Sequence, residues 1–432
     1  MTNKTDTAIL RLALPSIIQN VTVPLLGLCD VAVMGHVGGA AHIGAIAVGS
    51  MIFNVMYWLF GFLRMGTSGL TSQALGARRL DDVGAMLRRG LTVGVGLGLA
   101  IVLLQVPLRS LALALMRPTA DVAQLCLPYY NICVWGAPAV LGLYALNGWF
   151  VGMQNTRLPM LIAVVQNVVN ILLSLSLVVA AGWGIRGVAT GTLVAQWTGF
   201  AMALALLWRY YGPTLRRHPS TLASLFSGLG RFFRLNLDIF LRTLCLVAVN
   251  LWFTSAGAAQ GALTLAANTL LMQFFMFFSY VMDGFAYAGE ALSGRLYGAR
   301  NDAGLRRTVS RLFRIGWLVA IVFTTVYALA GDVLLRLLTS DADVVRHARR
   351  FLPWAVLIPL SGMAAFVWDG IYIGLTRSRD MLMACLVAAT AFFALWLALR
   401  PSLANHALWL ALLVYLVLRG LVLAALYRRR TP

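Results

Sequence analysis

The feature that most constrains this chain is the length of its apolar runs. No lysine or arginine occurs between Leu12 and Leu63, and comparable runs recur along all 432 residues. A helix needs about 20 mostly apolar residues to cross a bilayer. Hydrophobic residues make up 60% of the sequence and charged residues 11%, which leaves too few polar residues for a soluble protein of this size. Because the runs are continuous, they also exclude an outer-membrane barrel, whose strands alternate apolar and polar residues.

Splitting the runs at charges, glycines and prolines gives twelve expected transmembrane helices. They cover residues 12–35, 44–75, 90–115, 122–153, 158–181, 187–211, 235–256, 262–294, 308–331, 350–375, 381–399 and 404–427. The long connection near 212–234 separates the first six from the last six. We therefore expect an all-α membrane protein with an N-lobe over 1–215, a connection over 216–234 and a C-lobe over 235–432.

The net charge of +20 comes almost entirely from arginine, since Lys4 is the only lysine. Arginines gather in alternate connections, near 76–89, 216–234 and 295–314 and in the C-terminal tail, whereas the connections near 36–43 and 257–261 carry none. Cytoplasmic loops carry such an excess, so both termini and the central connection are expected in the cytoplasm. The basicity then needs no nucleic-acid partner.

One connection departs from this pattern. The segment 332–350 should lie on the opposite side of the membrane, yet it carries four arginines. Three aspartates in the same segment partly balance them: Asp332, Asp341 and Asp343.

Cysteine and histidine give no metal or disulfide pattern. The five cysteines lie in apolar segments without CxxC spacing and are interpreted as packing residues: Cys29, Cys126, Cys133, Cys245 and Cys385. The five histidines fall in connections or near span ends: His36, His42, His218, His347 and His406. The first helix lacks a small-residue cleavage site and is expected to be retained. A membrane-embedded enzyme is disfavoured, because it would need a nucleophile–base pair or a metal cluster at depth.

An internal repeat occurs at one constant displacement along the chain. Gly76-Ala77-Arg78 matches Gly298-Ala299-Arg300, and "NGWFVGMQNTR" matches "DGIYIGLTRSR" at the same displacement. Two matches at one displacement indicate two lobes of equal topology, related by an axis along the membrane normal. Secondary transporters are built from such repeats and bind their substrate between them. A duplicated channel or scaffold is the alternative.

A few charged side chains lie inside the expected spans, where each costs at least about 2.5–3.5 kcal/mol at mid-bilayer and commonly serves function. Asp238 and Arg242 share a helix face, as do Asp283 and Glu290. The alternative for Asp238 is a neutralising pair with Arg242. Two further residues, Asp369 and Arg64, complete a candidate substrate cavity or second protonatable cluster; Asp369 could instead pair with Arg377 or Arg379 near a helix end.

Asp30 is different, because no basic residue lies within a turn or two of it on its own span. Asn167, Asn170 and Ser174 share one face of the fifth span, and Thr192 lies in the sixth. A buried carboxylate with amide and hydroxyl neighbours can accept a proton or help to coordinate a small cation, and burial favours its protonated form. Pro15 and Pro24 make the first span a candidate bending element.

At this point the chain resembles the multidrug and toxic compound extrusion (MATE) transporters, and more narrowly their DinF branch. The stretches that carry the resemblance run along the whole chain: "LALPSIIQNV", "FLRMGTSGLTSQALGAR", "NGWFVGMQNTRLPM", "GIRGVATGTLVAQ", "RLNLDIFLRTL" and "DGFAYAGEALSGRLYGAR". The resemblance implies twelve helices in two lobes around a cavity that alternates between the two sides of the membrane. It implies export of amphipathic, often cationic compounds, driven by inward movement of protons or sodium.

The resemblance also assigns roles to residues. Asp30 matches an aspartate whose ion binding bends the first helix at a proline, which Pro15 matches. Asn170 and Thr192 match polar partners of that aspartate. Many relatives carry an acid where this chain has Ser174. Since one carboxylate compensates a sodium ion less well than two, proton coupling is the favoured expectation.

The expected protein is therefore a proton-coupled antiporter of a bacterial inner membrane, working as a monomer without a cofactor. A sodium-coupled exporter is one alternative. Another is a flippase for lipids or lipid-linked sugars, although such flippases often have fourteen spans and more basic cavities. The bulky aromatic and Met side chains suit amphipathic substrates, whose identity the sequence leaves open.

Overall fold

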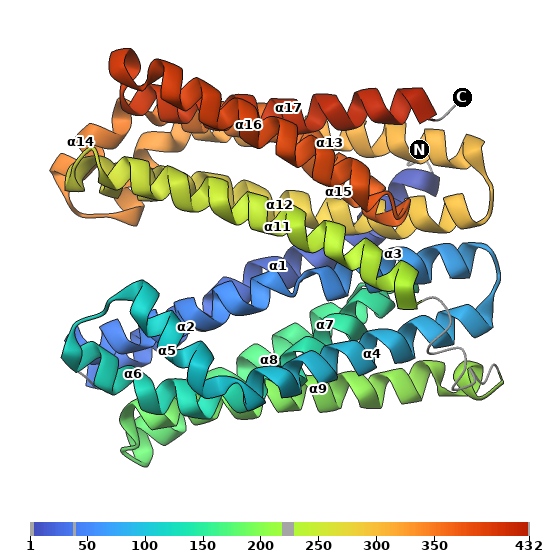
Figure 1. The fold of residues 1–432 in the computed structure, drawn as a ribbon, viewed down its shortest axis with the longest axis horizontal. Coiled ribbons are helices and arrows are strands. Elements are labelled where there is room, and N and C mark those ends of the chain that lie inside the picture. Colours follow the sequence, from blue (N-terminus) through green and yellow to red (C-terminus); the bar gives the residue numbers. More distant parts are fainter. Residues whose placement is uncertain (1–3, 38–39, 218–228, 431–432) are drawn as a thin grey trace. The chain divides into compact units, whose positions relative to one another are not determined.

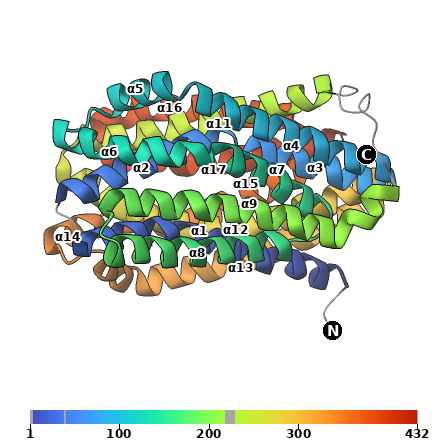
Figure 2. The ribbon, with the colours of Figure 1, turned by 90° about the horizontal axis from the view of Figure 1, so that it is seen from below.

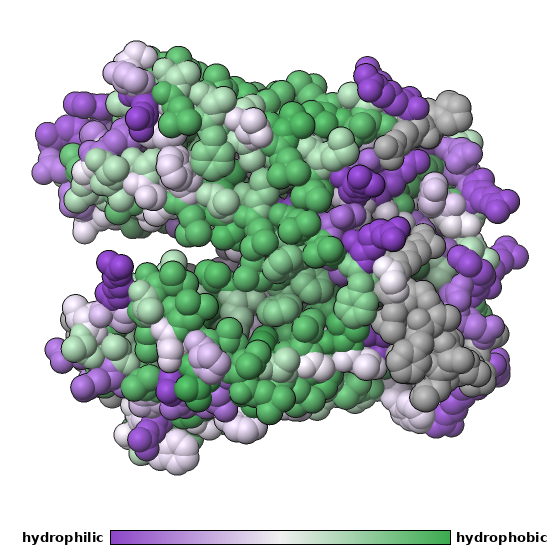
Figure 3. Space-filling model, viewed as in Figure 1, coloured by the Kyte–Doolittle hydropathy of each residue, from purple (hydrophilic) through white to green (hydrophobic). Residues whose placement is uncertain are grey.

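The structure, a computed structural model, describes residues 4–37, 40–217 and 229–430. Most of the expected connection over 216–234, including His218, lies outside these ranges, and so do the side chains of Cys29, His36 and Arg231. Within the ranges every regular element is a helix (Figure 1). Hydrophobic side chains cover the middle of the helices and hydrophilic ones gather toward their ends (Figure 3), as a bilayer requires.

Most helices of the first half agree with the expected spans. They are α1 (Lys4–Val37), α2 (Ala40–Leu59), α3 (Phe62–Gly76), α4 (Leu80–Leu103), α5 (Gln105–Met116), α6 (Ala120–Cys133), the short η1 (Val134–Gly136), α7 (Ala137–Gly152), α8 (Arg157–Leu175), the π-helical turn η2 (Ser176–Ala180) and α9 (Gly184–Arg217). Some spans consist of two consecutive helices, such as α2 with α3 and α6 with α7.

The second half follows the same order. Its helices are α11 (Leu229–Ala258), α12 (Ala262–Gly298), α13 (Asp302–Leu338), α14 (Ala342–Arg349), α15 (Leu352–Gly374), α16 (Ser378–Leu403) and α17 (Asn405–Arg430). Among the described residues, eleven segments are long and apolar enough to cross a membrane, and α1, with 34 residues, is a further long helix. The prediction of a multi-pass all-α membrane protein is confirmed.

The arginine-rich connections are shorter than expected. We predicted loops near 76–89 and 295–314, but α4 already begins at Leu80 and α13 at Asp302. The predicted span 90–115 is also wrong in its limits, because α4 ends at Leu103 and α5 is a separate helix. Arginine favours helix, and its long side chain lets the charged group reach water from a helix end. Charge therefore marks the edge of the hydrocarbon and not the end of the helix.

The repeat appears in the backbone of two pairs of turns. Arg78 and Arg300 both adopt a left-handed conformation, with φ of 57° and 53°, and so do Gln154 and Thr376, with φ of 64° and 54°. Both pairs have the displacement of the sequence repeat. In the first pair, the amide of Arg78 donates to Leu75 O at 3.1 Å, and that of Arg300 to Tyr297 O at 3.0 Å. Both helices thus end in the same way at repeated positions.

The repeat also fixes helix packing within each lobe. A Cβ at Gly148 of α7 would overlap the carbonyl of Arg64 in α3, and one at Gly370 of α15 would overlap that of Ala286 in α12. The two glycines are related by the displacement of the repeat, and so are the two carbonyls. Only glycine permits such close contact between helices, which is why small residues recur at interfaces of membrane helices.

Contacts divide the described chain into two compact units, one of residues 18–233 and the other of residues 1–17 with 234–432. The expected division placed the whole first helix in the N-lobe. By contacts, α1 instead belongs to the second unit up to Ile17 and to the first from Ile18 onward. We call these units the N-lobe (18–233) and the C-lobe (1–17 and 234–432).

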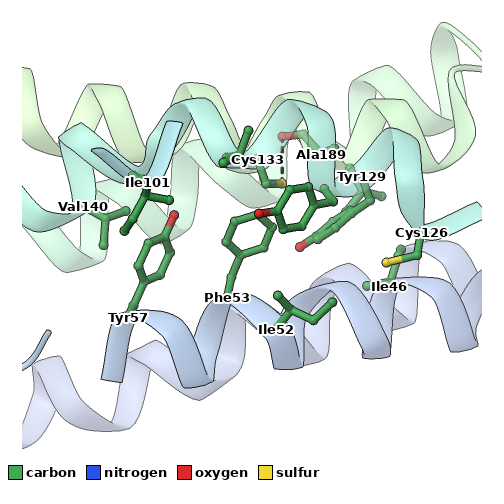
Figure 4. Close-up of a cluster of buried hydrophobic side chains, with 14 of the residues drawn as sticks. Ile46, Ile52, Phe53, Tyr57, Ile101, Cys126, Tyr129, Cys133, Val140 and Ala189 are labelled. Carbon is green, nitrogen blue, oxygen red and sulfur yellow. Dashed lines mark hydrogen bonds between the residues drawn. The ribbon is translucent and has the colours of Figure 1, made fainter. Parts of the chain in front are cut away.

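An aromatic cluster fills the core of the N-lobe near α2 and α6. Phe53 stacks on Tyr130 with a centroid distance of 5.2 Å and lies 6.4 Å from the ring of Tyr129 (Figure 4). Cys133, on the same helix as the two tyrosines, points its thiol at the carbonyl oxygen of Ala189 in α9, 3.7 Å away. This cluster holds α6 between α2 and α9, next to the site described below.

Candidate functional site

Asp30 lies in a buried polar cluster within the N-lobe. Its side chain is on α1 and only 2% exposed. Thr192 Oγ1 donates to Oδ2 of Asp30 at 3.3 Å, and Ser174 Oγ donates to Oδ1 at 3.5 Å. Asn170 Nδ2 in turn donates to Thr192 Oγ1 at 2.9 Å. The structure therefore brings together four of the residues that the sequence singled out, from three different helices.

These hydrogen bonds have a direction. A threonine hydroxyl carries one proton, so Thr192, which accepts from Asn170, gives its own proton to Asp30. Both hydroxyls thus act as donors to the aspartate, which suits the ionised carboxylate as an acceptor of hydrogen bonds. The cluster is arranged for a negative charge on Asp30.

A close contact between α8 and α9 places the two hydroxyls. These helices lie side by side (Figure 2), and Gly191 allows the approach. A Cβ at Gly191 would stand 2.8 Å from the backbone nitrogen of Ser174 and 2.5 Å from its hydroxyl, which is too close for any other residue. Thr192, the next residue, is consequently held beside Ser174. Gly191 was not predicted as part of the site, because its only signal in the sequence is a small residue directly before a candidate polar one.

Asn167 has a different position from the one its spacing suggested. It shares a helix face with Asn170 and Ser174, but its Nδ2 donates to the backbone carbonyl of Thr22 at 2.8 Å. Thr22 is eight residues before Asp30, or about 12 Å along a helix. Asn167 therefore fastens α8 to α1 and is not a partner of the carboxylate.

The α6 helix closes the site on another side. Tyr129 and Cys133 are buried and lie within electrostatic range of Asp30. The hydroxyl of Tyr129 also lies 3.2 Å from the hydroxyl of Ser50 in α2. From the sequence, Cys133 was interpreted as a packing residue, and Tyr129 was not a candidate. The helix that carries them shares no sequence pattern with α1, α8 or α9.

The charge of Asp30 is not neutralised by a cation of the described chain. The arginine ion pairs seen among residues 4–37, 40–217 and 229–430 join Asp6, Asp82, Asp332, Asp343 and Asp369, and none of these pairs includes Asp30. In that same part of the chain, no group of three or more His, Cys, Asp or Glu side chains is placed to hold a metal ion. A buried carboxylate that keeps hydroxyl donors but no paired cation is suited to binding a small cation or a proton.

The C-lobe contains a second charged cluster, with a different arrangement from the one expected. Asp369 forms ion pairs with Arg242 of α11 and Arg419 of α17, both through Oδ2. The expected pairs with Arg377 or Arg379 are wrong, because these two arginines follow the end of α15 at Gly374 whereas Asp369 lies inside the lobe. Arg419 was missed, since a single arginine in an apolar span gave no sign of its partner.

Three other acids were candidates for the substrate cavity or the second protonatable cluster, together with Arg64. Asp238 accepts a hydrogen bond from Ser378 at 2.8 Å. The alternative of a neutralising pair with Arg242 is wrong, because Arg242 pairs with Asp369. Asp283 accepts from Ser279 of its own helix at 3.4 Å. Glu290 is fully buried, whereas Arg64 is partly buried. A second protonatable cluster formed by these acids stays a prediction.

Pro15 lies in the part of α1 that belongs to the C-lobe and is buried. The helix continues through Pro15 and Pro24 from Lys4 to Val37. Because α1 passes from the C-lobe to the N-lobe at Ile17, Pro15 stands three residues before Ile18, where α1 joins the N-lobe.

Comparison with known proteins decides the family. The sequence profile of the MatE family matches residues 15–176 and again residues 237–396. The chain belongs to the MATE family. The two matches begin at residues 15 and 237, positions that are related by the displacement of the repeat. MATE proteins are multidrug and toxin efflux transporters, so the expected class of protein is confirmed.

Individual relatives place this MATE protein in the DinF branch. It is 39% identical over 424 residues to DNA damage-inducible protein F of Escherichia coli (strain K12), covering 98% of this chain and 92% of the relative. It is 25% identical over 362 residues to rabbit (Oryctolagus cuniculus) multidrug and toxin extrusion protein 1, covering 80% and 61%. A MATE crystal structure in the bent conformation matches with a TM-score of 0.87 at 20% identity, covering 99% of this chain and 96% of the other, which shows the shared fold.

Proposed function

We propose that this MATE protein exports amphipathic, often cationic small molecules in exchange for protons, and that Asp30 binds the proton. The observation that carries the proposal is the buried carboxylate of Asp30, which accepts two hydroxyl hydrogen bonds and pairs with no described arginine. Such a group can gain and lose a proton without breaking an ion pair. The substrate class follows from the family and from relatives named for multidrug and toxin extrusion.

Protonation would rearrange the cluster in a defined way. A protonated carboxyl group must donate one hydrogen bond, whereas Asp30 now accepts two. The Thr192 hydroxyl is held as a donor to Asp30 because it accepts from Asn170. The Ser174 hydroxyl can turn to accept, so we place the proton on Oδ1. The loss of charge weakens the contacts between α1 and the pair α8 and α9.

Changed contacts at Asp30 would then act on α1. Asn167 fastens this helix to α8 at Thr22. Pro15 has no backbone N–H to donate, which weakens α1 three residues before Ile18, where α1 joins the N-lobe. We infer that bending begins near Pro15 and displaces substrate outward. Coupling requires that the proton and the substrate favour different states.

A sodium-coupled exporter is the second candidate, and one observation favours it. Asn170 Oδ1 is buried and has no hydrogen-bond partner among the described residues. Together with Asp30 and two hydroxyls, it would complete a set of oxygen ligands of the kind that hard cations prefer. Only one of these ligands is charged, which is why we favour the proton.

The experiment that separates the two ions uses purified protein in proteoliposomes, with dye efflux driven by an imposed pH gradient or an imposed sodium gradient. Proton coupling predicts efflux under the pH gradient alone. Thr192→Val removes one donor to the carboxylate and should move the half-maximal pH of efflux upward. Thr198→Val is the matched control, because Thr198 is partly exposed on the same helix and bonds to the Val194 carbonyl. Efflux that follows only the sodium gradient would reject proton coupling.

The proposal also covers the membrane in which the protein lies, its orientation and its oligomeric state. The bacterial relative supports an inner-membrane location, and the arginine distribution supports cytoplasmic termini. We further propose a monomer, since each lobe supplies its own packed core. A flippase for lipid-linked sugars is less well supported, because the two relatives described above are named for other roles.

A further inference from the structure

A groove in the C-lobe is lined by residues of α13, α15 and α17. The helices α13 and α17 each pack against α15 rather than against each other, so a face of α15 forms the floor between them. The groove has a volume of about 480 Å³, which is within the range of about 300–1,000 Å³ that holds small ligands. Ala364 on the floor and Ala424 on one wall have small side chains, which leaves room in the groove. Gly420 lets α17 approach α15 closely, because a Cβ there would stand 2.8 Å from the Cβ of Ala364.

One end of the groove is aromatic and basic. Trp368 of α15 contacts Phe313 of α13 and Tyr427 of α17, with centroid distances of 4.9 and 4.8 Å. Arg428 follows Tyr427 and also lines the groove. Aromatic rings with an adjacent basic residue are typical of the level at which lipid headgroups lie. The rest of the lining is apolar apart from Ser361, whose hydroxyl is bonded to the Leu357 carbonyl.

The length of the groove matches one leaflet. Along α17 the lining begins at Val417 and ends at Arg428, which is about 16 Å at the rise of an α-helix. One leaflet contributes half of a hydrocarbon core of about 30 Å. An acyl chain that filled the groove would therefore reach from the middle of the bilayer to the arginine, where its headgroup would lie.

We propose that this groove binds an acyl chain of an anionic phospholipid, with the lipid phosphate on Arg428. The charge is complementary, the lining is apolar and aromatic, and the arginine stands at the end where a phosphate would be. The orientation proposed above places that end in the cytoplasmic leaflet, which carries anionic lipids. A single basic residue near an anionic surface contributes a factor of about five in affinity.

The test uses tryptophan fluorescence of the full chain in nanodiscs. Phosphatidylcholine discs receive a rising fraction of phosphatidylglycerol with brominated acyl chains, which quench tryptophan on contact. The contribution of the groove is the difference between the natural chain and Trp317→Phe, since Trp317 lines the groove. We expect this contribution to be quenched at phosphatidylglycerol fractions well below those needed with brominated phosphatidylcholine.

Three variants decide the outcome. Arg428→Gln should raise the phosphatidylglycerol fraction at half-quenching about fivefold, whereas Arg429→Gln, which removes the same charge from an exposed residue that does not line the groove, should leave it unchanged. Ala424→Phe, which fills the hollow, should abolish the preference. Equal quenching by the two lipids, or equal effects of the two arginine variants, would overturn the proposal.

Discussion

The triad of Asp369, Arg242 and Arg419 allows a sharp prediction about stability. The carboxylate faces two arginines, and the side chains are only 12%, 6% and 7% exposed. Asp369→Asn leaves two buried positive charges without their counter-charge. Removing one partner of a buried pair costs about 3–5 kcal/mol.

Removing one arginine has a smaller expected effect. Arg419→Met leaves Asp369 and Arg242 as a neutral pair, and methionine fills a similar volume, so the cost should be about 1 kcal/mol or less. The two variants remove one charge each. The difference between them therefore reports the excess positive charge of the triad rather than the number of ion pairs lost.

The assay is thermal unfolding of the purified protein in one detergent. For a unit of roughly 200 residues, each kcal/mol shifts the midpoint by about 2–4 °C. Asp369→Asn should then lower Tm by about 6–20 °C, and Arg419→Met by about 4 °C or less. Asp332→Asn is the control, since its pairs with Arg336 and Arg349 are solvent-exposed and contribute about 1 kcal/mol or less. If Arg419→Met proved as destabilising as Asp369→Asn, the charge argument would be refuted.

Two further predictions concern the N-lobe site and His347 of α14. Gly191→Ala places a methyl group against the backbone of Ser174, so it should lower the free energy of unfolding by about 1–3 kcal/mol. It should also reduce pH-driven efflux, because it moves Thr192 away from Asp30. Unchanged efflux would show that this helix contact does not position the Thr192 hydroxyl. Burial, aided by the charge of Arg350, lowers the pKa of His347. The stabilising effect of the neutral His347 ring is present above the ordinary histidine pKa and is lost as the pH falls through the lowered pKa of the folded protein. The Tm should therefore fall between about pH 7 and 5, and it should fall less in His347→Gln. An identical decline in the variant and the natural chain would contradict this assignment.

Much of the fold could be predicted because apolar length and repeated sequence act locally. The span limits came within a few residues for most helices, and the displacement of the sequence repeat reappears in the left-handed turns at Arg78 and Arg300. The limits of α4 were wrong, because Arg88 and Arg89 looked like loop residues yet are helical. Helical arginines at a membrane edge and arginines in a loop have the same local pattern.

The site was only partly predictable, since it depends on which helices meet. Helical spacing grouped Asn170 with Ser174, and the family resemblance added Thr192 as a partner of Asp30; the structure brings these side chains together. Spacing could not show that Asn167 bonds to the backbone of Thr22 instead. Partners from distant segments carry no mutual signal in one sequence, and their roles in transport stay predictions.

The ion pairs near residues 332–350 of the C-lobe show which contacts the sequence could predict and which it could not. The segment 332–350 broke the expected charge pattern, and three of its four arginines form ion pairs with aspartates of the same segment. Asp332 bonds to Arg336 at 3.1 Å and also to Arg349, and Asp343 lies 3.4 Å from Arg346. The pairs Asp332–Arg336 and Asp343–Arg346 could be predicted because these partners are four and three residues apart, whereas Asp332 and Arg349 lie on different helices.

The most direct test of the central claim is dye efflux from proteoliposomes under an imposed pH gradient, with Asp30→Asn compared with the natural protein. Asparagine keeps the size of the side chain but cannot exchange a proton. We predict that pH-driven efflux is lost in Asp30→Asn and retained in Asp121→Asn, which removes an exposed carboxylate from the first turn of α6. Efflux that stays coupled to the pH gradient in Asp30→Asn would contradict the assignment of Asp30 as the proton-binding residue.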